Sequence, residues 1–177
     1  MGTPSADPVE TQRAPVGRIV PLGREHLPGF HAALDRIARE GRYLALLQAP
    51  SLARTRKFVL DSLKSGAIHL VVLDGSDVIG WCDVRPKSAA TQRHSAVLGM
   101  GLLNEYRGLG IGSRLLAAAL ELAHERGLRR IELVVRADNE VALRLYRRYG
   151  FQPEGTLHRY LNVDGVDHDA LVMARLE

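Results

Sequence analysis

The sequence has almost no cysteine and no long apolar run. Cys82 is the single cysteine among 177 residues, so an intramolecular disulfide and a cysteine-based metal site are both excluded. No apolar run approaches the roughly 20 residues that a membrane-spanning helix needs. The first fifteen residues lack the apolar core of a signal peptide. We predict a flexible tail over residues 1–15 and a cytoplasmic protein with no membrane contact and no metal.

Aromatic residues are also few, at 5% of the chain, while Lys and Arg outnumber Asp and Glu by 24 to 20. A basic balance can serve nucleic acid binding. Here the arginines are scattered and no stacking aromatic residues lie among them, so we expect no nucleic acid partner. The positive charge suits a polyanionic cofactor equally well. With 46% hydrophobic and 25% charged residues, the composition is typical of a soluble globular protein, and we predict one domain over residues 16–177.

Apolar periodicity and turn residues predict an alternating order of elements, β-α-α-β-β-β-α-β-α-β-β. Helices are expected at 24–40, 51–65, 113–126 and 139–149. Strands are expected at 17–22, 67–73, 78–84, 94–103, 131–135, 156–163 and 168–176. The strands that flank the helix at 113–126 are the only expected parallel neighbours. The pattern therefore predicts an α/β protein with a mixed sheet.

The most informative motif is the glycine-rich run Arg107-Gly108-Leu109-Gly110-Ile111-Gly112. It follows a strand-like stretch and precedes a helix that we expect Ser113 to open. Glycines let the backbone approach an anion closely, and the first N–H groups of a helix have no internal partner and lie at the positive end of its dipole. Such a turn can bind pyrophosphate without a lysine. The missing Gly-Lys-Ser/Thr excludes a Walker loop, and the spacing and late position of the glycines do not fit a dinucleotide-binding fingerprint.

A second pattern lies downstream, after the strand at 130–135. It reads Asn139-x-x-Ala-x-x-Leu-Tyr146-x-x-x-Gly-Phe151. Together with Arg107-x-x-Gly-x-Gly, it resembles the GCN5-related N-acetyltransferase (GNAT) family over residues 66–177. The resemblance implies that family's single-domain fold, a central and mostly antiparallel sheet flanked by helices.

The resemblance also implies an activity. Acetyl-CoA would be the cosubstrate, and its acetyl group would pass directly to a primary amine of an amino acid, a small amine or a peptide N-terminus. It allows a homodimer. The alternative is a non-catalytic module that binds or senses acyl-CoA on the same fold. The residues implied in cofactor binding are Met100, Leu102, Leu103, Arg107, Gly108, Gly110, Gly112, Ser113 and Asn139. Several of them also have structural interpretations, as core residues at 100–103 and as a helix N-cap at Asn139.

The catalytic residues are less completely indicated. By resemblance, Tyr146 lies near the CoA sulfur, where a protonated phenol can serve as general acid; a tyrosine packed in the core is the alternative. The general base stays open, because residues 95–103 contain no acidic side chain; the candidates are His94, which we favour, Asp83 and His69. The acceptor pocket is expected between residues 27–60 and the C-terminal hairpin, with walls drawn from Glu40, Tyr43, Trp81, His158, Tyr160 and Asp164.

Overall fold

The computed structural model describes residues 17–177, so the tail predicted at residues 1–15 lies outside the described part of the chain. A seven-stranded sheet runs through that part in the order β1-β2-β3-β4-β5-β7-β6. Its strands are Arg18–Pro21 (β1), Ile68–Asp74 (β2), Asp77–Pro86 (β3), Ser95–Leu102 (β4), Arg130–Arg136 (β5), Gln152–Val163 (β6) and Val166–Leu176 (β7). Every neighbouring pair is antiparallel except β4 with β5. The predicted mixed sheet and its one parallel pair are therefore confirmed.

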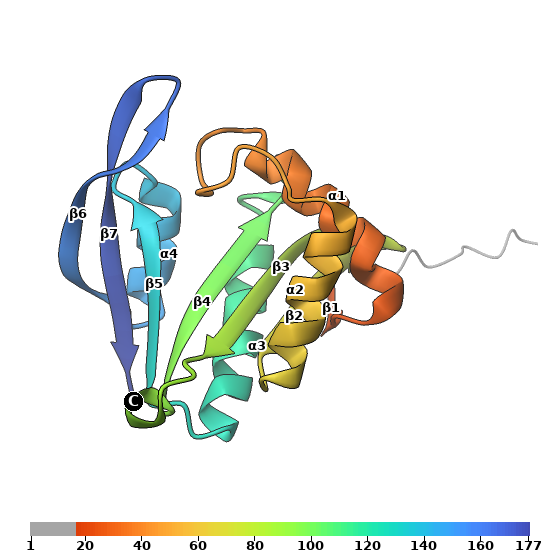
Figure 1. Cartoon of the computed structure of the whole chain (residues 1–177), viewed down its shortest axis with the longest axis horizontal. Helices are drawn as coiled ribbons and strands as arrows, with labels where there is room; N and C mark the ends of the chain where they lie inside the picture. The colour runs from red at the N-terminus through yellow and green to blue at the C-terminus, as the bar shows by residue number, and fades with distance from the viewer. Residues whose placement is uncertain (1–16) are drawn as a thin grey trace, which may run out of the picture.

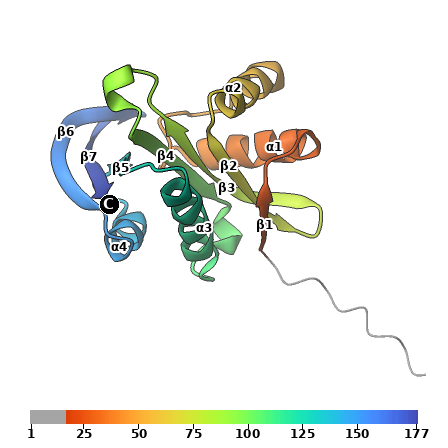
Figure 2. The ribbon, with the colours of Figure 1, turned by 90° about the horizontal axis from the view of Figure 1, so that it is seen from below.

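Four α-helices cover the two faces of this sheet. They are Leu27–Ala38 (α1), Leu52–Lys64 (α2), Ile111–Glu125 (α3) and Glu140–Arg148 (α4). Figure 2 shows α1 and α2 on one face and α3 and α4 on the other. None of the helices within residues 17–177 is long and apolar enough to cross a membrane.

The parallel pair separates along its length. Pairing of β4 with β5 is confined to 95–97 against 130–132. Beyond it, β4 continues to Leu102 and β5 to Arg136, and the two strands diverge toward the end where α3 begins (Figure 1). Because a strand edge carries N–H and C=O groups that need partners, this gap, which we call the β4–β5 gap, is a ready site for an extended ligand.

The core explains the helix pattern that the sequence carries. In α3 the apolar positions Leu115, Leu116, Ala119, Leu120 and Ala123 are all buried, and the helix packs on β2 and β3. Fully burying a leucine side chain stabilises a fold by about 1.5–3 kcal/mol. This stripe therefore fixes the position of α3, and with it the turn at its N-terminus.

Some element boundaries differ from those predicted. Helix α3 begins at Ile111, two residues before the predicted start at Ser113, because Gly110 takes the N-cap position. Strand β6 begins at Gln152, earlier than the predicted 156. Pro153 is tolerated there because β6 is the edge strand and is bulged between Pro153 and Gly155. Neither difference moves the glycine turn away from the β4–β5 gap.

Candidate active site

The glycine turn between β4 and α3 has the backbone that an anion site requires. Gly108 has φ +77° and Gly110 has φ +75°, in the left-handed region that favours glycine. A Cβ placed on either residue would meet no atom within 4 Å, so the space beside both is open. Gly112 lies in the first turn of α3 with ordinary backbone, and a Cβ there would lie 3.8 Å from Met100 Cε and 3.8 Å from Leu145 Cδ2. The three glycines thus leave the backbone accessible next to the β4–β5 gap.

The N-terminus of α3 adds the donors. The first N–H groups of a helix have no partner within it; in α3, the N–H of Arg114 is the first that bonds back, to the Gly110 carbonyl at 3.2 Å. No acidic residue stands in the first turn. The N–H groups of residues 111–113 and the positive end of the helix dipole therefore suit a pyrophosphate. These residues include Gly112 and Ser113, which the sequence predicted at the cofactor.

The edge of β4 suits the extended arm of the cofactor. Leu103 donates its N–H to the Ile79 carbonyl of β3 at 2.9 Å. Alternation along an antiparallel strand then turns the backbone groups of Leu102 and Met100 the other way, toward the gap. Leu103 itself is buried in the core. Of the three predicted residues of this stretch, Met100 presents free strand edge. At Leu102 the N–H faces the gap, while the carbonyl accepts from Arg107 Nε at 2.8 Å. The contact predicted for Leu103 stays a prediction.

Tyr146 reaches the same region from α4. Asn139 caps that helix, its Oδ1 accepting from the Ala142 N–H at 3.2 Å. The Tyr146 ring is 7% exposed and packs against Phe151, with 5.7 Å between centroids. Burial, with a smaller contribution from the nearby Cys82 thiol, raises the pKa of the Tyr146 phenol well above its usual value. No hydrogen bond is found for its hydroxyl within residues 17–177, so the protonated phenol is available as a donor.

Tyr149 offers a contrast on the same helix. Its hydroxyl donates to the Ser113 carbonyl at 2.9 Å and so ties α4 to the first turn of α3. Tyr149 thus has a structural role, whereas Tyr146 has a hydroxyl available for chemistry. Cys82, whose thiol acts electrostatically on the Tyr146 phenol, is the cross-strand neighbour of Met100, so Tyr146 approaches the sheet from the side of α4, toward β4.

A cavity of about 570 Å³ opens at the mouth of the gap, on the side of α1. The residues that line it come from the end of α1, the loop behind it and the turn between β4 and α3: Arg36, Glu40, Arg42, Tyr43, Leu103, Asn104, Glu105 and Arg107. Glu40 and Tyr43 are among the predicted walls of the acceptor pocket. Arg36 and Arg42 fall within the stretch 27–60 that was predicted to build this pocket. Leu103 and Arg107 were predicted at the cofactor instead, and Asn104 and Glu105 were not predicted, because nothing local in the sequence brings residues 103–107 next to α1.

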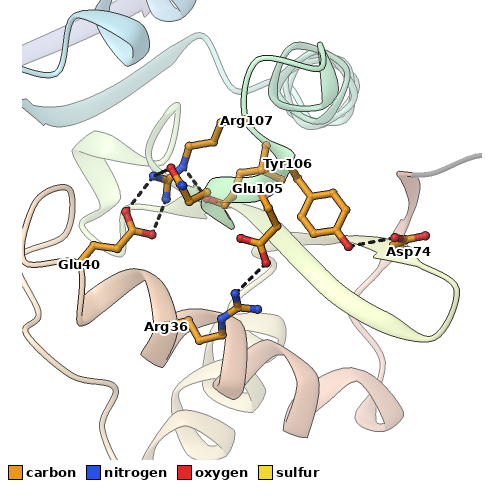
Figure 3. Close-up of polar contacts among 8 residues, drawn as sticks. Arg36, Glu40, Asp74, Glu105, Tyr106 and Arg107 are labelled. Carbon is orange, nitrogen blue, oxygen red and sulfur yellow. Dashed lines mark hydrogen bonds and ion pairs between the residues drawn. The ribbon is translucent and has the colours of Figure 1, made fainter.

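Two ion pairs cross this acceptor cavity (Figure 3). Arg107 donates from Nη1 and Nη2 to the two carboxylate oxygens of Glu40, at 2.8 and 2.7 Å, and from Nε to the Leu102 carbonyl at 2.8 Å. Its guanidinium also lies 4.7 Å from the centre of the Tyr43 ring. Arg36 and Glu105 make the second pair, at 2.7 Å. The Arg107 side chain is thus held by protein partners, and its predicted contact with the cofactor stays a prediction.

The remaining predicted residues lie in different places. Trp81 is buried against Phe30 of α1, 5.4 Å between ring centres. His158 is paired with Asp169 across the β6–β7 hairpin, at 2.9 Å. Neither lines the acceptor cavity, nor do Tyr160 and Asp164 of the same hairpin.

The three candidate bases are also separated. His94 is exposed at the N-terminal end of β4, where its carbonyl accepts from the N–H groups of Arg129 and Arg130. Met100 is six residues away along the strand, roughly 20 Å. The structure therefore does not bring His94 to the gap, and we no longer favour it as the general base. Asp83 and His69 are buried on the face of the sheet that α1 covers.

Comparisons with known proteins show the family of the chain. A family model described as acetyltransferase (GNAT) family matches residues 32–151. The L-amino acid N-acetyltransferase AaaT of Escherichia coli K12 is 32% identical over 116 residues, which are 64% of this chain and 71% of AaaT.

Solved structures give the same result for the fold. The ribosomal-protein-alanine N-acetyltransferase of Brucella melitensis is similar with a TM-score of 0.84 and 25% identity, over 90% of this chain and 99% of that one. A phosphinothricin acetyltransferase of Sinorhizobium meliloti, solved with acetyl-CoA, has a TM-score of 0.85 at 21% identity, over 91% of this chain and 88% of that one. With the glycine turn, the β4–β5 gap and the second motif in place, the chain belongs to the acetyltransferase (GNAT) family and is an acetyl-CoA-dependent N-acetyltransferase that acts on a peptide or amine substrate.

Proposed function

We propose that the acceptor is a primary α-amine, carried by an amino acid or by the N-terminus of a peptide. The observation that carries this proposal is the acceptor cavity, which has side chains of both charges and an aromatic wall at the mouth of the β4–β5 gap. An α-amine needs an oxygen acceptor, which Glu40 or Glu105 would supply by sharing its carboxylate with Arg107 or Arg36. The neighbouring carboxylate or carbonyl needs a donor. AaaT is named for L-amino acids, and the Brucella protein for a protein alanine.

Arg42 is the donor best placed for a carboxylate. Arg36 is occupied by Glu105 and Arg107 by Glu40. Arg42 lines the same cavity, is exposed, and contacts the Tyr43 ring at 5.6 Å. No carboxylate partner is found for it among the described residues. A guanidinium binds a carboxylate through two parallel N–H groups.

Acetyl-CoA supplies the activated acetyl group, and the residues around it divide the remaining work. The N–H groups of residues 111–113 hold the pyrophosphate, and the edge of β4 at Met100 and the Leu102 N–H aligns the extended arm. Asn139, at the cap of α4, is a further proposed contact to that arm. Tyr146 gives its proton to the departing sulfur, because its raised pKa keeps the phenol protonated at neutral pH.

A non-catalytic acyl-CoA sensor on this fold is the second candidate. Such a module would need the glycine turn that holds the pyrophosphate but not a buried phenol kept protonated, so Tyr146 favours catalysis. We further place the enzyme in the cytoplasm, without membrane or nucleic acid partners, on the basis of its single cysteine and scattered charge. We propose a homodimer as its assembly, which the mass in solution would test.

The proposal is tested by release of CoA thiol with an amine panel. The panel contains L-amino acids, peptides with a free N-terminus, the same peptides with a blocked N-terminus and one free lysine, and simple alkylamines. We expect turnover with free α-amines and a much higher KM for alkylamines of equal pKa. Arg42→Met should raise the KM for an amino acid and leave the KM for acetyl-CoA unchanged. Equal efficiency with the N-terminally blocked peptides would contradict the assignment.

A further inference from the structure

A polar cluster is buried beneath α1, on the face of the sheet opposite Tyr146. Asp83 of β3 is 6% exposed and His69 of β2 is 3% exposed, and the two are cross-strand neighbours. Arg85 Nε lies 2.7 Å from Asp83 Oδ2. Within residues 17–177, neither His69 nitrogen nor this Asp83 oxygen makes a well-aligned hydrogen bond. Burying such groups costs several kcal/mol of folding free energy unless hydrogen bonds or opposite charges compensate for it. A cluster retained at that cost suggests a functional role.

Strand β4 carries glycines, and so no side chains, next to Asp83 and Trp81. Asp83 is paired with Gly99 of β4, and a Cβ on Gly99 would lie 3.0 Å from Asp83 Oδ1. Gly101 has the same relation to Trp81, whose ring would clash with any Cβ there. On this face, therefore, no β4 side chain stands between the Asp83 carboxylate and the β4–β5 gap. Adjacent strands are about 4.8 Å apart, a separation that one water molecule bridges.

Asp83 also lies level with Tyr146 along β4. It follows Cys82, the residue whose thiol acts electrostatically on the Tyr146 phenol. Successive residues of a strand point to opposite faces, so the carboxylate and the phenol flank the same stretch of β4 from its two sides. The acceptor cavity opens on the side of α1, which is the side of Asp83.

We propose that Asp83 is the group that takes the proton from the acceptor amine, through one water that lies over Gly99. This inference rests on the proposed function of the gap. Burial raises the pKa of the Asp83 carboxyl, while Arg85 and the Trp81 indole act in the opposite direction; the net result is a carboxylate more basic than an exposed one. His69 is the weaker candidate, because burial and Arg85 lower its pKa to about 4 and its ring packs edge-on against Phe30.

The proposed step balances as follows. An ammonium N–H gives its proton to the water, and that water gives a proton to the Asp83 carboxylate. The freed nitrogen lone pair forms a bond to the acetyl carbonyl carbon, and the carbon–sulfur bond breaks. Tyr146 gives its proton to the departing sulfur, and the proton still in excess on the new amide nitrogen replaces it through solvent. Asp83 later releases its proton to bulk water.

The test compares Asp83→Asn, Asp83→Glu and His69→Gln with the wild type, using an amine that the wild type acetylates. We expect Asp83→Asn to lower kcat by about 10²–10⁴-fold near neutral pH, the usual scale for general base catalysis. Its KM for acetyl-CoA should stay unchanged. The difference in kcat between Asp83→Asn and the wild type should narrow as pH rises toward the α-amine pKa of about 8. Asp83→Glu should restore part of the rate. His69→Gln should keep the shape of the pH profile.

A second variant covers the case in which Asp83→Asn fails to fold. Gly99→Ala keeps the carboxylate and puts a methyl group 3.0 Å from Asp83 Oδ1, where it crowds both the carboxylate and the water, so it too should lower kcat while acetyl-CoA still binds. The inference is overturned if wild type turns over and folded Asp83→Asn or Gly99→Ala matches its kcat and pH profile. It is also overturned if His69→Gln alone reproduces the loss. A wild type that turns over no amine would refute the proposed function itself, and the inference with it.

Discussion

Gly112→Ala should make the protein more stable and a weaker binder of acetyl-CoA. Gly112 lies in the first turn of α3 with backbone that any residue can adopt. An added Cβ would lie 3.8 Å from its nearest neighbours, Met100 Cε and Leu145 Cδ2, which is an ordinary contact distance. Alanine in place of glycine within a helix stabilises by about 0.5–1 kcal/mol. For a chain of this length, that corresponds to a rise in Tm of roughly 1–4 °C.

The same methyl group would lie in the first turn of α3, beside the N–H groups that we propose for the pyrophosphate. If it prevents one backbone N–H from reaching a phosphate, a hydrogen bond to a charged group worth about 1.5–3 kcal/mol is lost, or roughly a 10- to 150-fold rise in Kd. Calorimetric titration with acetyl-CoA measures the affinity, and a thermal melt without ligand measures the stability. An unchanged Kd for acetyl-CoA in a variant with raised Tm would refute the assignment of this turn as the pyrophosphate site.

Three further predictions follow from the geometry. Tyr146→Phe keeps the ring packing and removes only the donor, so kcat should fall by about 10²-fold or more with the Kd of acetyl-CoA unchanged in a titration; a wild-type rate with chemistry limiting would remove Tyr146 from the mechanism. Gly110→Ala and Gly127→Ala introduce the same left-handed strain, about 1–2 kcal/mol, at opposite ends of α3, and only the first should weaken acetyl-CoA binding; equal loss in both would point to strain alone. His69 has a folded pKa of about 4 and an unfolded one near 6.5, so the unfolded state binds the extra proton between these values. Its contribution to the free energy of unfolding, about 3 kcal/mol, is complete above pH 6.5 and is lost as pH falls to 4. Denaturant melts of His69→Phe should lack that part of the pH dependence, and identical pH slopes in variant and wild type would exclude it.

Much of the fold was predictable because its signals are local. The stripe of apolar residues in α3 and the glycine turn before it are both read directly from the sequence. The start of α3 was misplaced because Ser113 has the chemistry of an N-cap, whereas Gly110 takes that position through a left-handed backbone. Sequence preference for a capping side chain cannot detect that geometry.

The parts of the site that depend on distant contacts were not predictable. The pair of Arg107 with Glu40 joins residues 67 positions apart, and no periodicity relates them. His94 was favoured because imidazole has a suitable pKa, but its position along β4 decided the matter. Asp83 is a candidate base because Gly99 next to it has no side chain. Only the register between β3 and β4 makes these two residues neighbours.

The most direct test of the account is mass spectrometry of the acceptor after incubation with acetyl-CoA, with CoA thiol release followed in the same samples. The acceptors are an amino acid, a peptide with a free N-terminus, and that peptide with its N-terminus blocked and a lysine free. The account predicts one acetyl group on each free α-amine, with an equal amount of CoA released, and no acetyl group on the blocked peptide. Acetyl-CoA that binds and is never consumed, or acetylation confined to the lysine, would contradict it.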